Sequence, residues 1–363
     1  MVSDRLMRWA AVALLAPLCG CASLTYLGQA AHGEWQLLHA RRPIARLVAS
    51  PATPATLRTR LELVQDIRRF AVTDLGLPDN RSYRSYSDLH RSYVVWNVVA
   101  TPQFSVLPLH WCFPVSGCVN YRGYFKERRA RAFAAKLSAH GDDVQLDGVT
   151  AFSTLGHLPD PVLNTMLQYD DLDLAGTIFH ELAHQLFYVP GDSEFDESFA
   201  MTVESQGLAH WLAARGRGGE LAGYQRERRL QGEVDELMAQ GRSQLASLYA
   251  MSLPVSIKRL RKQAILHQIT DRIVALEQRE HWRSSYDAWL ARGLNNATLA
   301  AVATYADCVP GFERLLQDNH DELRAFYAAV RRVGKDPAAR RALCASAPAP
   351  ATTVRAAGTA DAL

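Results

Sequence analysis

The sequence predicts a mostly helical protein of the α+β class, in which a small mixed β-sheet lies next to a helix that carries two histidines. β-branched and aromatic residues concentrate in residues 90–155, as is typical of strands. From residue 172 to about residue 333, apolar residues recur at helical spacing instead. Strands followed by a run of helices are the pattern of an α+β domain, and the sequence shows no internal repeat.

The composition indicates a soluble, globular protein of one large or two modest domains. The chain has 363 residues, a formal charge of +3 and 48% hydrophobic residues. Two basic runs, residues 126–132 and 224–233, are interpreted as solvated helix faces. Because the basic excess is small and scattered, we do not expect a nucleic-acid-binding protein.

The first twenty residues are typical of a secretory signal peptide, since Arg5 and Arg8 precede a short apolar run. The motif "LCGC", which ends at Cys21, resembles the bacterial lipobox and implies lipid attachment at Cys21. Because residue 22 is Ala22 and not aspartate, the resemblance implies an anchor on the periplasmic side of the outer membrane. A plain secretory signal is the alternative. No later segment has the length and apolarity expected of a transmembrane helix.

The N-terminal half combines helices with short strands. We expect a pair of helices at residues 26–48 and 55–75. Residues 93–109 predict two strands broken at a proline. A helix over residues 126–139 leads to a second strand pair, residues 143–156, which is expected to turn at an Asp-Gly dipeptide.

Residues 173–213 predict two consecutive helices separated by "VPGD". The first helix is expected to begin near Asp173. The second is expected to begin at Ser193, where "SEFD" resembles a capping box. Asp196 would then cap this second helix, because a negative charge is favoured at a helix N-terminus.

A long helical hairpin of residues 219–249 and 255–282 follows, with its turn at Pro254. Shorter helices continue to about residue 333. The mature chain is therefore expected to form one domain, residues 21–330. Residues 335–363 are rich in Ala, Pro and Thr, so we expect a disordered tail.

The expected export makes the other cysteines candidates for disulfides. Cys112 and Cys118 enclose five residues in a loop that can close on itself, so we expect a disulfide between them. Cys308 and Cys344 could pair by elimination. Since Cys344 lies in the expected disordered tail, a free thiol is the alternative.

The stretch "IFHELAHQLFY" carries the strongest chemical signal. His180 and His184 are four residues apart, so on a helix they point the same way from successive turns, about 6 Å apart. Two imidazoles so placed can hold one Zn²⁺, which keeps an open position for water when only three protein ligands bind. Glu181 can take a proton from that water as general base. Such a triplet also arises by chance, so a third ligand is required.

The following helix offers two acidic candidates for the third ligand. If the two helices pack antiparallel across their short connection, Glu197 lies at the height of His184. We therefore expect Glu197 to bind the metal. Glu204 lies about 10 Å further along the axis and is expected to orient His180.

These residues resemble the gluzincin pattern of zinc peptidases, in which "HELAH" is followed by a motif of the form N-E-x-F-A-x-x-x-E. In "DESFAMTVE", Glu197 matches the first glutamate and Glu204 the closing one. Asp196 replaces the usual asparagine, and the interval after His184 is shorter than in thermolysin. Measured to Glu204, 19 residues intervene, as in thermolysin, so Glu204 is the second candidate for the ligand.

A longer series of motifs resembles one family, the predicted zinc aminopeptidase lipoproteins of Gram-negative bacteria. In order along residues 20–330, the motifs are "YLGQAAHGEWQLL", "WCFPVSGCVNYRGYF", "AFSTLGHLPDPVL" and "FHELAHQLFYVPGDSEFDESFA". The resemblance implies a Zn²⁺-dependent peptidase that removes N-terminal residues. The amine-anchoring motif of the large zinc aminopeptidases is not recognisable in the sequence.

Two further roles are expected beside the metal. "TAFSTLG", residues 150–156, could be an edge strand that pairs with the substrate backbone, or a plain structural strand. A tetrahedral intermediate also needs a hydrogen-bond donor. Among Tyr121, Tyr124 and Tyr188 we choose Tyr121, because it follows the expected cysteine loop closely.

The leading hypothesis is therefore a metallopeptidase acting on peptides, with Zn²⁺ held by His180, His184 and Glu197. Glu181 would take a proton from water and pass it to the leaving amine. The alternative is a lipid-anchored periplasmic binding or assembly lipoprotein with a structural metal site. Glu181 favours the enzyme, because structural zinc sites usually have four protein ligands and need no neighbouring carboxylate.

Overall fold

The computed structural model describes residues 26, 28–113, 117–151, 153–154, 158–306 and 308–345. The expected signal peptide and the expected lipid attachment site, Cys21, lie outside the described residues. Helices account for 64% of the described residues, and the strands found among them form three small sheets, in agreement with a mostly helical α+β protein. Within the described residues, no helix combines the length and apolarity needed to cross a bilayer.

The N-terminal helices are more broken than predicted. Residues 28–39 are helical, the two-residue strand β1 (Arg42–Pro43) follows, and α2 (Ile44–Ala49) resumes the helix. The single helix expected over residues 26–48 is therefore wrong, because Pro43 lacks an N–H group and disfavours helical geometry in the residue before it. Helix α3 (Ala55–Thr73) buries one apolar face against α5, described below.

The largest antiparallel sheet has the order β6-β3-β7. Its strands are β3 (Val95–Thr101), β6 (Arg122–Tyr124) and β7 (Asp143–Val149). The turn expected within β7 does not form, because β7 pairs continuously with β3 along its whole length. Helix α4 (Glu127–His140) packs on this sheet through a small apolar cluster.

The remaining strands form two separate small sheets, so the single mixed sheet predicted for residues 90–155 is wrong. Strand β2 (Ser85–Ser87) pairs antiparallel with β1 and parallel with β8 (Val162–Leu163). Strands β4 (Trp111–Phe113) and β5 (Gly117–Val119) form a hairpin closed by the expected Cys112–Cys118 disulfide. Such short strands do not join one sheet because prolines and loops interrupt the ladders between them.

Two further strand expectations also fail. The segment after Pro102 forms turns and bends and no strand up to β4, because proline ends the ladder of β3. The segment expected as an edge strand, residues 150–156, has no strand at residues 150, 151, 153 and 154, and its other residues lie outside those described. Hydrogen bonds from Ser153 and Thr154 to the side chain of Asp160 hold this segment instead.

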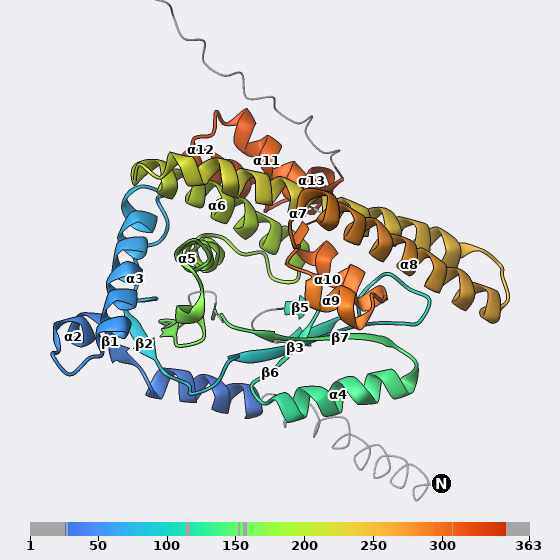
Figure 1. Cartoon of the computed structure of the whole chain (residues 1–363), viewed down its shortest axis with the longest axis horizontal. Helices are drawn as coiled ribbons and strands as arrows, with labels where there is room; N and C mark the ends of the chain where they lie inside the picture. Colours follow the sequence, from blue (N-terminus) through green and yellow to red (C-terminus); the bar gives the residue numbers. More distant parts are fainter. Residues whose placement is uncertain are drawn as a thin grey trace, which may run out of the picture.

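Helix α5 (Asp171–Leu186) lies near the middle of the molecule, with α3 on one side and α6 (Ser193–Ala214) on another (Figure 1). A short 3₁₀ turn, η1 (Met166–Gln168), precedes it, and the side chain of Asp170 caps its first turn. Helix α5 begins two residues before the predicted start. Gly207 allows α6 to approach α5 closely, because an added Cβ would lie 2.7 Å from the ring of Phe179.

The predicted hairpin is present as α7 (Gly218–Ala250) and α8 (Val255–Glu280). It has its own apolar core, and Figure 1 shows it projecting to one side of the molecule. Two shorter helices, α9 (Asp287–Arg292) and α10 (Asn296–Ala306), follow it in the chain, and α10 packs between α6, α7 and the β6-β3-β7 sheet.

The C-terminal segment is more ordered than the sequence suggested. Helices α11 (Val309–Asp318) and α12 (Leu323–Val333) are followed by α13 (Pro337–Cys344). The disordered tail expected from residue 335 is therefore wrong for residues up to 345, and the rest lies outside the described residues. The reason is a disulfide between Cys308 and Cys344, which fixes α13 against α11.

Candidate metal centre

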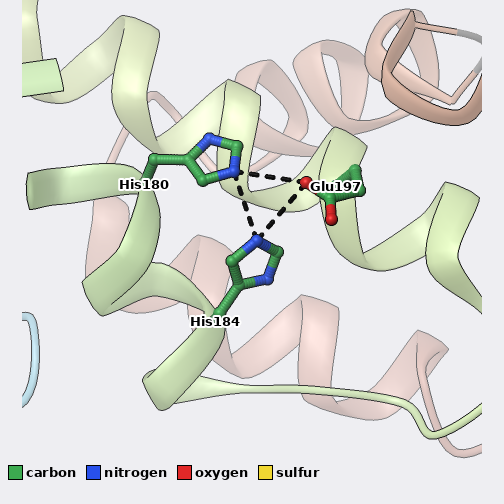
Figure 2. Close-up of side chains that lie close together, drawn as sticks. All are labelled: His180, His184 and Glu197. Atoms are coloured by element: carbon green, nitrogen blue, oxygen red, sulfur yellow. Dashed lines mark hydrogen bonds and ion pairs between the residues drawn. The ribbon is translucent and has the colours of Figure 1, made fainter. Parts of the chain in front are cut away.

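Three side chains converge between α5 and α6. The Nε2 atoms of His180 and His184 are 3.2 Å apart, and Oε2 of Glu197 lies 3.3 Å from the first and 3.5 Å from the second (Figure 2). In the described part of the chain, these form the one group of three His, Cys, Asp or Glu side chains that could hold a metal ion. Two neutral imidazole nitrogens and one carboxylate oxygen are a donor set that suits Zn²⁺.

Glu204 contacts the opposite side of the His180 ring. The Nδ1 atom of His180 donates a hydrogen bond of 3.1 Å to Oε2 of Glu204. This contact leaves Nε2 of His180 directed at Glu197. The structure therefore separates the two candidate glutamates. Glu197 lies beside the Nε2 atoms of both histidines, whereas Glu204 contacts Nδ1 of His180. The Nδ1 atom of His184 is buried without a hydrogen-bond partner among the described residues.

The turn between the two helices sets the position of Glu197. Gly191 adopts a left-handed conformation, with φ of 88°, where the chain reverses. The side chain of Asp192 then caps α6 by accepting a hydrogen bond from the backbone N–H of Phe195. Asp196 was expected to be the cap, but it already lies within the helix and instead accepts a hydrogen bond of 2.8 Å from the N–H of Val189.

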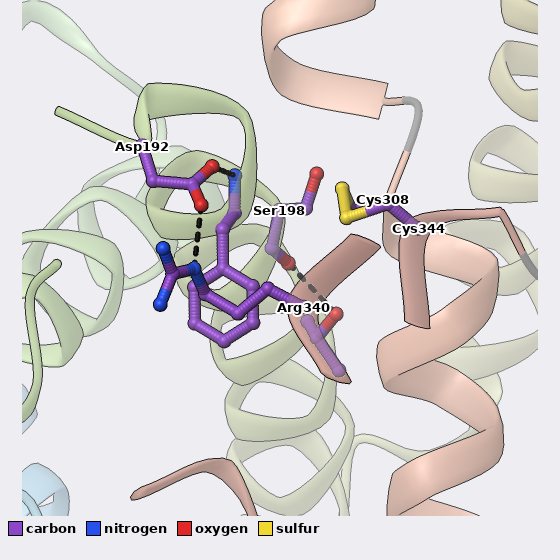
Figure 3. The surroundings of a disulfide bond; sticks show 7 residues. Asp192, Ser198, Cys308, Arg340 and Cys344 are labelled. Carbon is purple, nitrogen blue, oxygen red and sulfur yellow. Dashed lines mark hydrogen bonds and ion pairs between the residues drawn. A yellow bond between two sulfur atoms is a disulfide. The ribbon is translucent and has the colours of Figure 1, made fainter. Parts of the chain in front are cut away.

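A C-terminal helix braces the same turn (Figure 3). The Nε atom of Arg340, on α13, donates a hydrogen bond of 2.6 Å to the second carboxylate oxygen of Asp192. Its Nη1 atom binds the carbonyl oxygen of Gly334. The disulfide of Cys308 and Cys344 lies at the end of α13. Asp192 is therefore held from both sides, by α6 and by α13.

Burial and charge shape the acid–base properties of these groups. Burial acts to raise the pKa of Glu197, but the charges and hydrogen bonds of His184 and His180 outweigh burial and hold this pKa well below its ordinary value. Glu204 follows the same pattern, with its pKa lowered chiefly by His180. Burial raises the pKa of Asp196 to about 9, and its Oδ2 has no hydrogen-bond partner among the described residues.

Glu181 lies beside the three converging side chains. Burial raises the pKa of its carboxyl group, while the charges of His180 and His184 act to lower it. Ser153, on the segment expected as an edge strand, also acts to lower the pKa of Glu181, and its hydroxyl donates a hydrogen bond of 3.2 Å to Oδ2 of Asp160. A buried carboxyl with a raised pKa is suited to taking and returning a proton near neutral pH.

Asp160, which was not predicted as a site residue, ties the Ser153 segment to α5. Its Oδ1 accepts hydrogen bonds from the backbone N–H and the hydroxyl of Thr154. Its Oδ2 accepts one of 3.0 Å from Nε2 of Gln185, the residue after His184. Burial raises the pKa of Asp160 to about 6. No local sequence signal marks the contact with Gln185, because the two residues are 25 positions apart.

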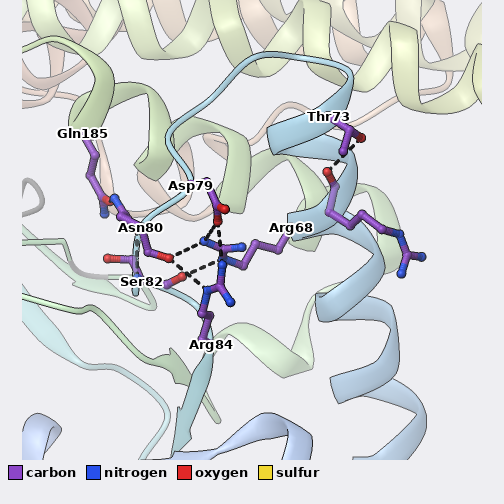
Figure 4. Close-up of polar contacts among 8 residues, drawn as sticks. Arg68, Thr73, Asp79, Asn80, Ser82, Arg84 and Gln185 are labelled. Atoms are coloured by element: carbon purple, nitrogen blue, oxygen red, sulfur yellow. Dashed lines mark hydrogen bonds and ion pairs between the residues drawn. The ribbon is translucent and has the colours of Figure 1, made fainter.

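Gln185 extends this network towards α3 (Figure 4). Its Oε1 accepts a hydrogen bond of 2.6 Å from Nδ2 of Asn80. Arg68, on α3, binds the carbonyl oxygens of Asn80 and Ser82 and the carboxylate of Asp79. A continuous polar network thus connects α3, the loop before β2, α5 and the Ser153 segment.

The three candidate tyrosines are in different surroundings. Burial raises the pKa of Tyr121, and the negative charges of Glu197 and Glu181 raise it further. The pKa of Tyr188 is raised to about 12 by burial and by Asp196 and Glu197. Tyr124 packs instead on Tyr26 and Phe133, in the cluster under α4. Tyr121 and Tyr188 thus remain the candidates for a hydrogen-bond donor.

Comparison with known protein families matches residues 25–344 to the family described as "Putative aminopeptidase". The chain belongs to this family. The match covers every described strand and all the helices from α2 to α13. No curated protein and no solved structure matches the chain.

Family membership supports a peptidase function and confirms the aminopeptidase family suggested by the sequence motifs. The matched range includes the two helices that carry His180, His184 and Glu197, and also the Cys308–Cys344 pair that braces them.

Proposed function

We propose that this protein is a Zn²⁺-dependent aminopeptidase of the bacterial periplasm, anchored to the outer membrane by a lipid on Cys21. The observation that carries the proposal is the convergence of two histidine Nε2 atoms and the Glu197 carboxylate, with the buried carboxyl of Glu181 beside them. The donor set fits Zn²⁺, because one ligand histidine is hydrogen-bonded through its other nitrogen to a carboxylate, as zinc ligands commonly are.

Each residue then has a distinct task. Zn²⁺ bound at this site would supply Lewis acidity for the scissile carbonyl and favour ionisation of water. Glu181 takes a proton from the attacking water and delivers it to the leaving amine, which its raised pKa favours. Tyr121 donates a hydrogen bond to the oxygen that gains negative charge, and its raised pKa keeps the phenol protonated.

The decisive test replaces the proton carrier and leaves the metal ligands intact. We expect Glu181→Gln to keep stoichiometric zinc, measured by atomic emission, and to lose about 10²–10⁴-fold in kcat/KM on peptides with a free N-terminus. Glu62→Gln, on the exposed surface of α3, is the control and should cleave like wild type. If Glu181→Gln retains zinc and full activity, the proposed mechanism is wrong.

The same assay distinguishes an aminopeptidase from an endopeptidase and from a lipoprotein without peptidase activity. N-acetylated versions of the same peptides should be cleaved far more slowly, since an aminopeptidase requires a free amine. Equal cleavage of blocked peptides would indicate an endopeptidase. Bound zinc without cleavage of any peptide would favour a lipoprotein with a structural metal site. Mass spectrometry of the mature N-terminus tests the lipid on Cys21 separately.

A further inference from the structure

A strongly cationic helix lies on the side of the molecule where the described chain begins. Residues 126–140 contribute a formal charge of +4, whereas the whole chain carries +3, so the remaining residues sum to −1. The single carboxylate of this stretch, Glu127, pairs with Arg131 at 2.6 Å. The five cationic side chains are all exposed: Lys126, Arg128, Arg129, Arg131 and Lys136.

The N-terminal helix, residues 28–39, continues this surface. Its only acid, Glu34, has a buried carboxylate oxygen, and burial raises the pKa of Glu34 to about 7, so it contributes less negative charge to this surface than an exposed glutamate would. On its outer side the indole of Trp35 is 56% exposed and stacks on the ring of His39, 4.7 Å between centroids. An exposed tryptophan beside cations is typical of a membrane-facing surface.

The two helices meet around a cavity of about 230 Å³. Gln29 fixes the contact, because its amide donates to the carbonyl of Gly123 and accepts from the N–H of Phe125. The cavity is lined by His32 from one helix and by Lys126 and Arg129 at the start of the other. Three groups that can carry positive charge therefore surround a space large enough for a phosphate group.

We propose that this cationic face, defined by His32, Trp35, Lys126 and Arg129 with the neighbouring cations of α4, binds the surface of an anionic phospholipid bilayer. Lys126 and Arg129 would contact lipid phosphates while Trp35 enters the headgroup layer. Charge complementarity supports this partner, because each cation near an anionic surface adds about 1 kcal/mol of attraction. The sequence predicts a solvated helix face at residues 126–132, and this proposal adds a lipid partner for it.

The position of the face agrees with the anchor proposed above. Gly28 lies seven positions after Cys21, and an extended segment of that length spans at most about 24 Å. A lipid on Cys21 would therefore keep the cationic face near the bilayer. In Figure 1, α4 and the N-terminal helix form the lower edge of the molecule, and α6 and α7 lie on the opposite side, away from that surface.

Quenching of tryptophan fluorescence by brominated phosphatidylglycerol tests the proposal on the full chain as processed by its host and reconstituted into vesicles. We expect quenching that disappears in Trp35→Phe and in vesicles where the brominated lipid is phosphatidylcholine and no anionic lipid is present. Quenching should also weaken between about 0.1 M and about 1 M salt, as the Debye length falls from ~10 to ~3 Å. Lys126→Glu/Arg129→Glu should lose at least about fivefold of the Trp35-dependent signal.

The matched control reverses two exposed cations elsewhere. Arg259→Glu/Arg261→Glu, at the tip of the α7–α8 hairpin, changes the net charge equally and should keep the signal. If Trp35→Phe is quenched like wild type, or if the control loses the signal as strongly as the α4 variant, the proposal is wrong. Should the glutamate variant not fold by circular dichroism, Lys126→Gln/Arg129→Gln replaces it. Peptide hydrolysis in detergent should be equal in all variants, so the outcome is independent of the proposed enzyme mechanism.

Discussion

At the scale of single residues, the candidate site depends on one feature that is local in sequence, the spacing of two histidines, and on one tertiary contact. The four-residue spacing of His180 and His184 places both imidazoles on one side of α5. Glu197 joins them only because the chain reverses at Gly191 and α6 returns alongside α5. The two relations together bring the three ligand atoms within 4.8 Å of one another.

The contact between Glu204 and His180 leads to a prediction about metal affinity. Glu204→Gln keeps a hydrogen-bond acceptor but removes the charge beside His180, so we expect zinc affinity to fall about 10–100-fold. Glu197→Ala removes a ligand and should lose more. Competition with a chelator measures both dissociation constants. If zinc stays bound in Glu197→Ala but is lost in Glu204→Ala, the two glutamates have exchanged roles.

Only the site residues that lie on helices could be predicted from the sequence. The histidines, Glu181 and the two candidate glutamates were recognisable because their spacing follows helix geometry. Ser153 and Asp160 were not, because a hydroxyl and a carboxylate in a loop have no spacing that points to α5. Their contacts arise only when the loop folds over the helix that carries Glu181.

At the scale of elements, α5 and α6 depend on a brace from a distant helix. Helix α13 is joined to the rest of the chain by the Cys308–Cys344 disulfide, and its Arg340 binds the residue that caps α6. The sequence left this pairing open, because its richness in alanine does not indicate whether the segment around Cys344 packs against the rest of the domain. The brace exists because α13 contacts both α11 and α12, which brings Cys344 to Cys308.

The disulfides should differ in their contribution to stability. Cys308 and Cys344 are 36 residues apart, so Cys308→Ser/Cys344→Ser should lower the free energy of unfolding by about 3–4 kcal/mol. Cys112→Ser/Cys118→Ser opens a loop with a separation of only 6 residues and should cost about 2 kcal/mol. Urea denaturation of the oxidised proteins compares them. A larger loss in the short-loop variant would contradict the expectation.

At the scale of the whole molecule, buried polar contacts join the α7–α8 hairpin to the β6-β3-β7 sheet. The largest apolar core surrounds α3, α5 and α6, and a second core is shared by the α7–α8 hairpin and α10. Lys262, on α8, donates a hydrogen bond of 2.5 Å to Asp143, the first residue of β7. Asp143 also accepts one from the backbone N–H of Asn296. This pair fixes the hairpin to the sheet across 119 residues of sequence.

Breaking that pair should destabilise the domain strongly. Lys262→Ala leaves the carboxylate of Asp143 without its ion-pair partner in a half-buried position, so we expect a loss of about 3–5 kcal/mol in the free energy of unfolding. Adding Asp143→Asn should recover part of the loss, because the unpaired charge disappears. Chemical denaturation of the single and double variants gives the coupling energy. Arg261→Ala, its exposed neighbour on α8, should change stability by less than about 0.5 kcal/mol.

The sequence by itself determined the class of the fold, the positions of the long helices and the identity of the metal-site candidates. These properties depend on local periodicity, which a helix imposes over three or four residues. The short strands were predicted poorly, because strand pairing depends on partners far along the chain. The sequence ranked Glu197 before Glu204 and left the state of Cys344 open, and only the tertiary structure shows that Glu197 meets both histidines and that Cys344 pairs with Cys308. The tertiary structure also places the basic helix α4 beside the N-terminal helix (Figure 1). Each of these is a contact between segments distant in sequence, and its energy exists only after the chain has folded.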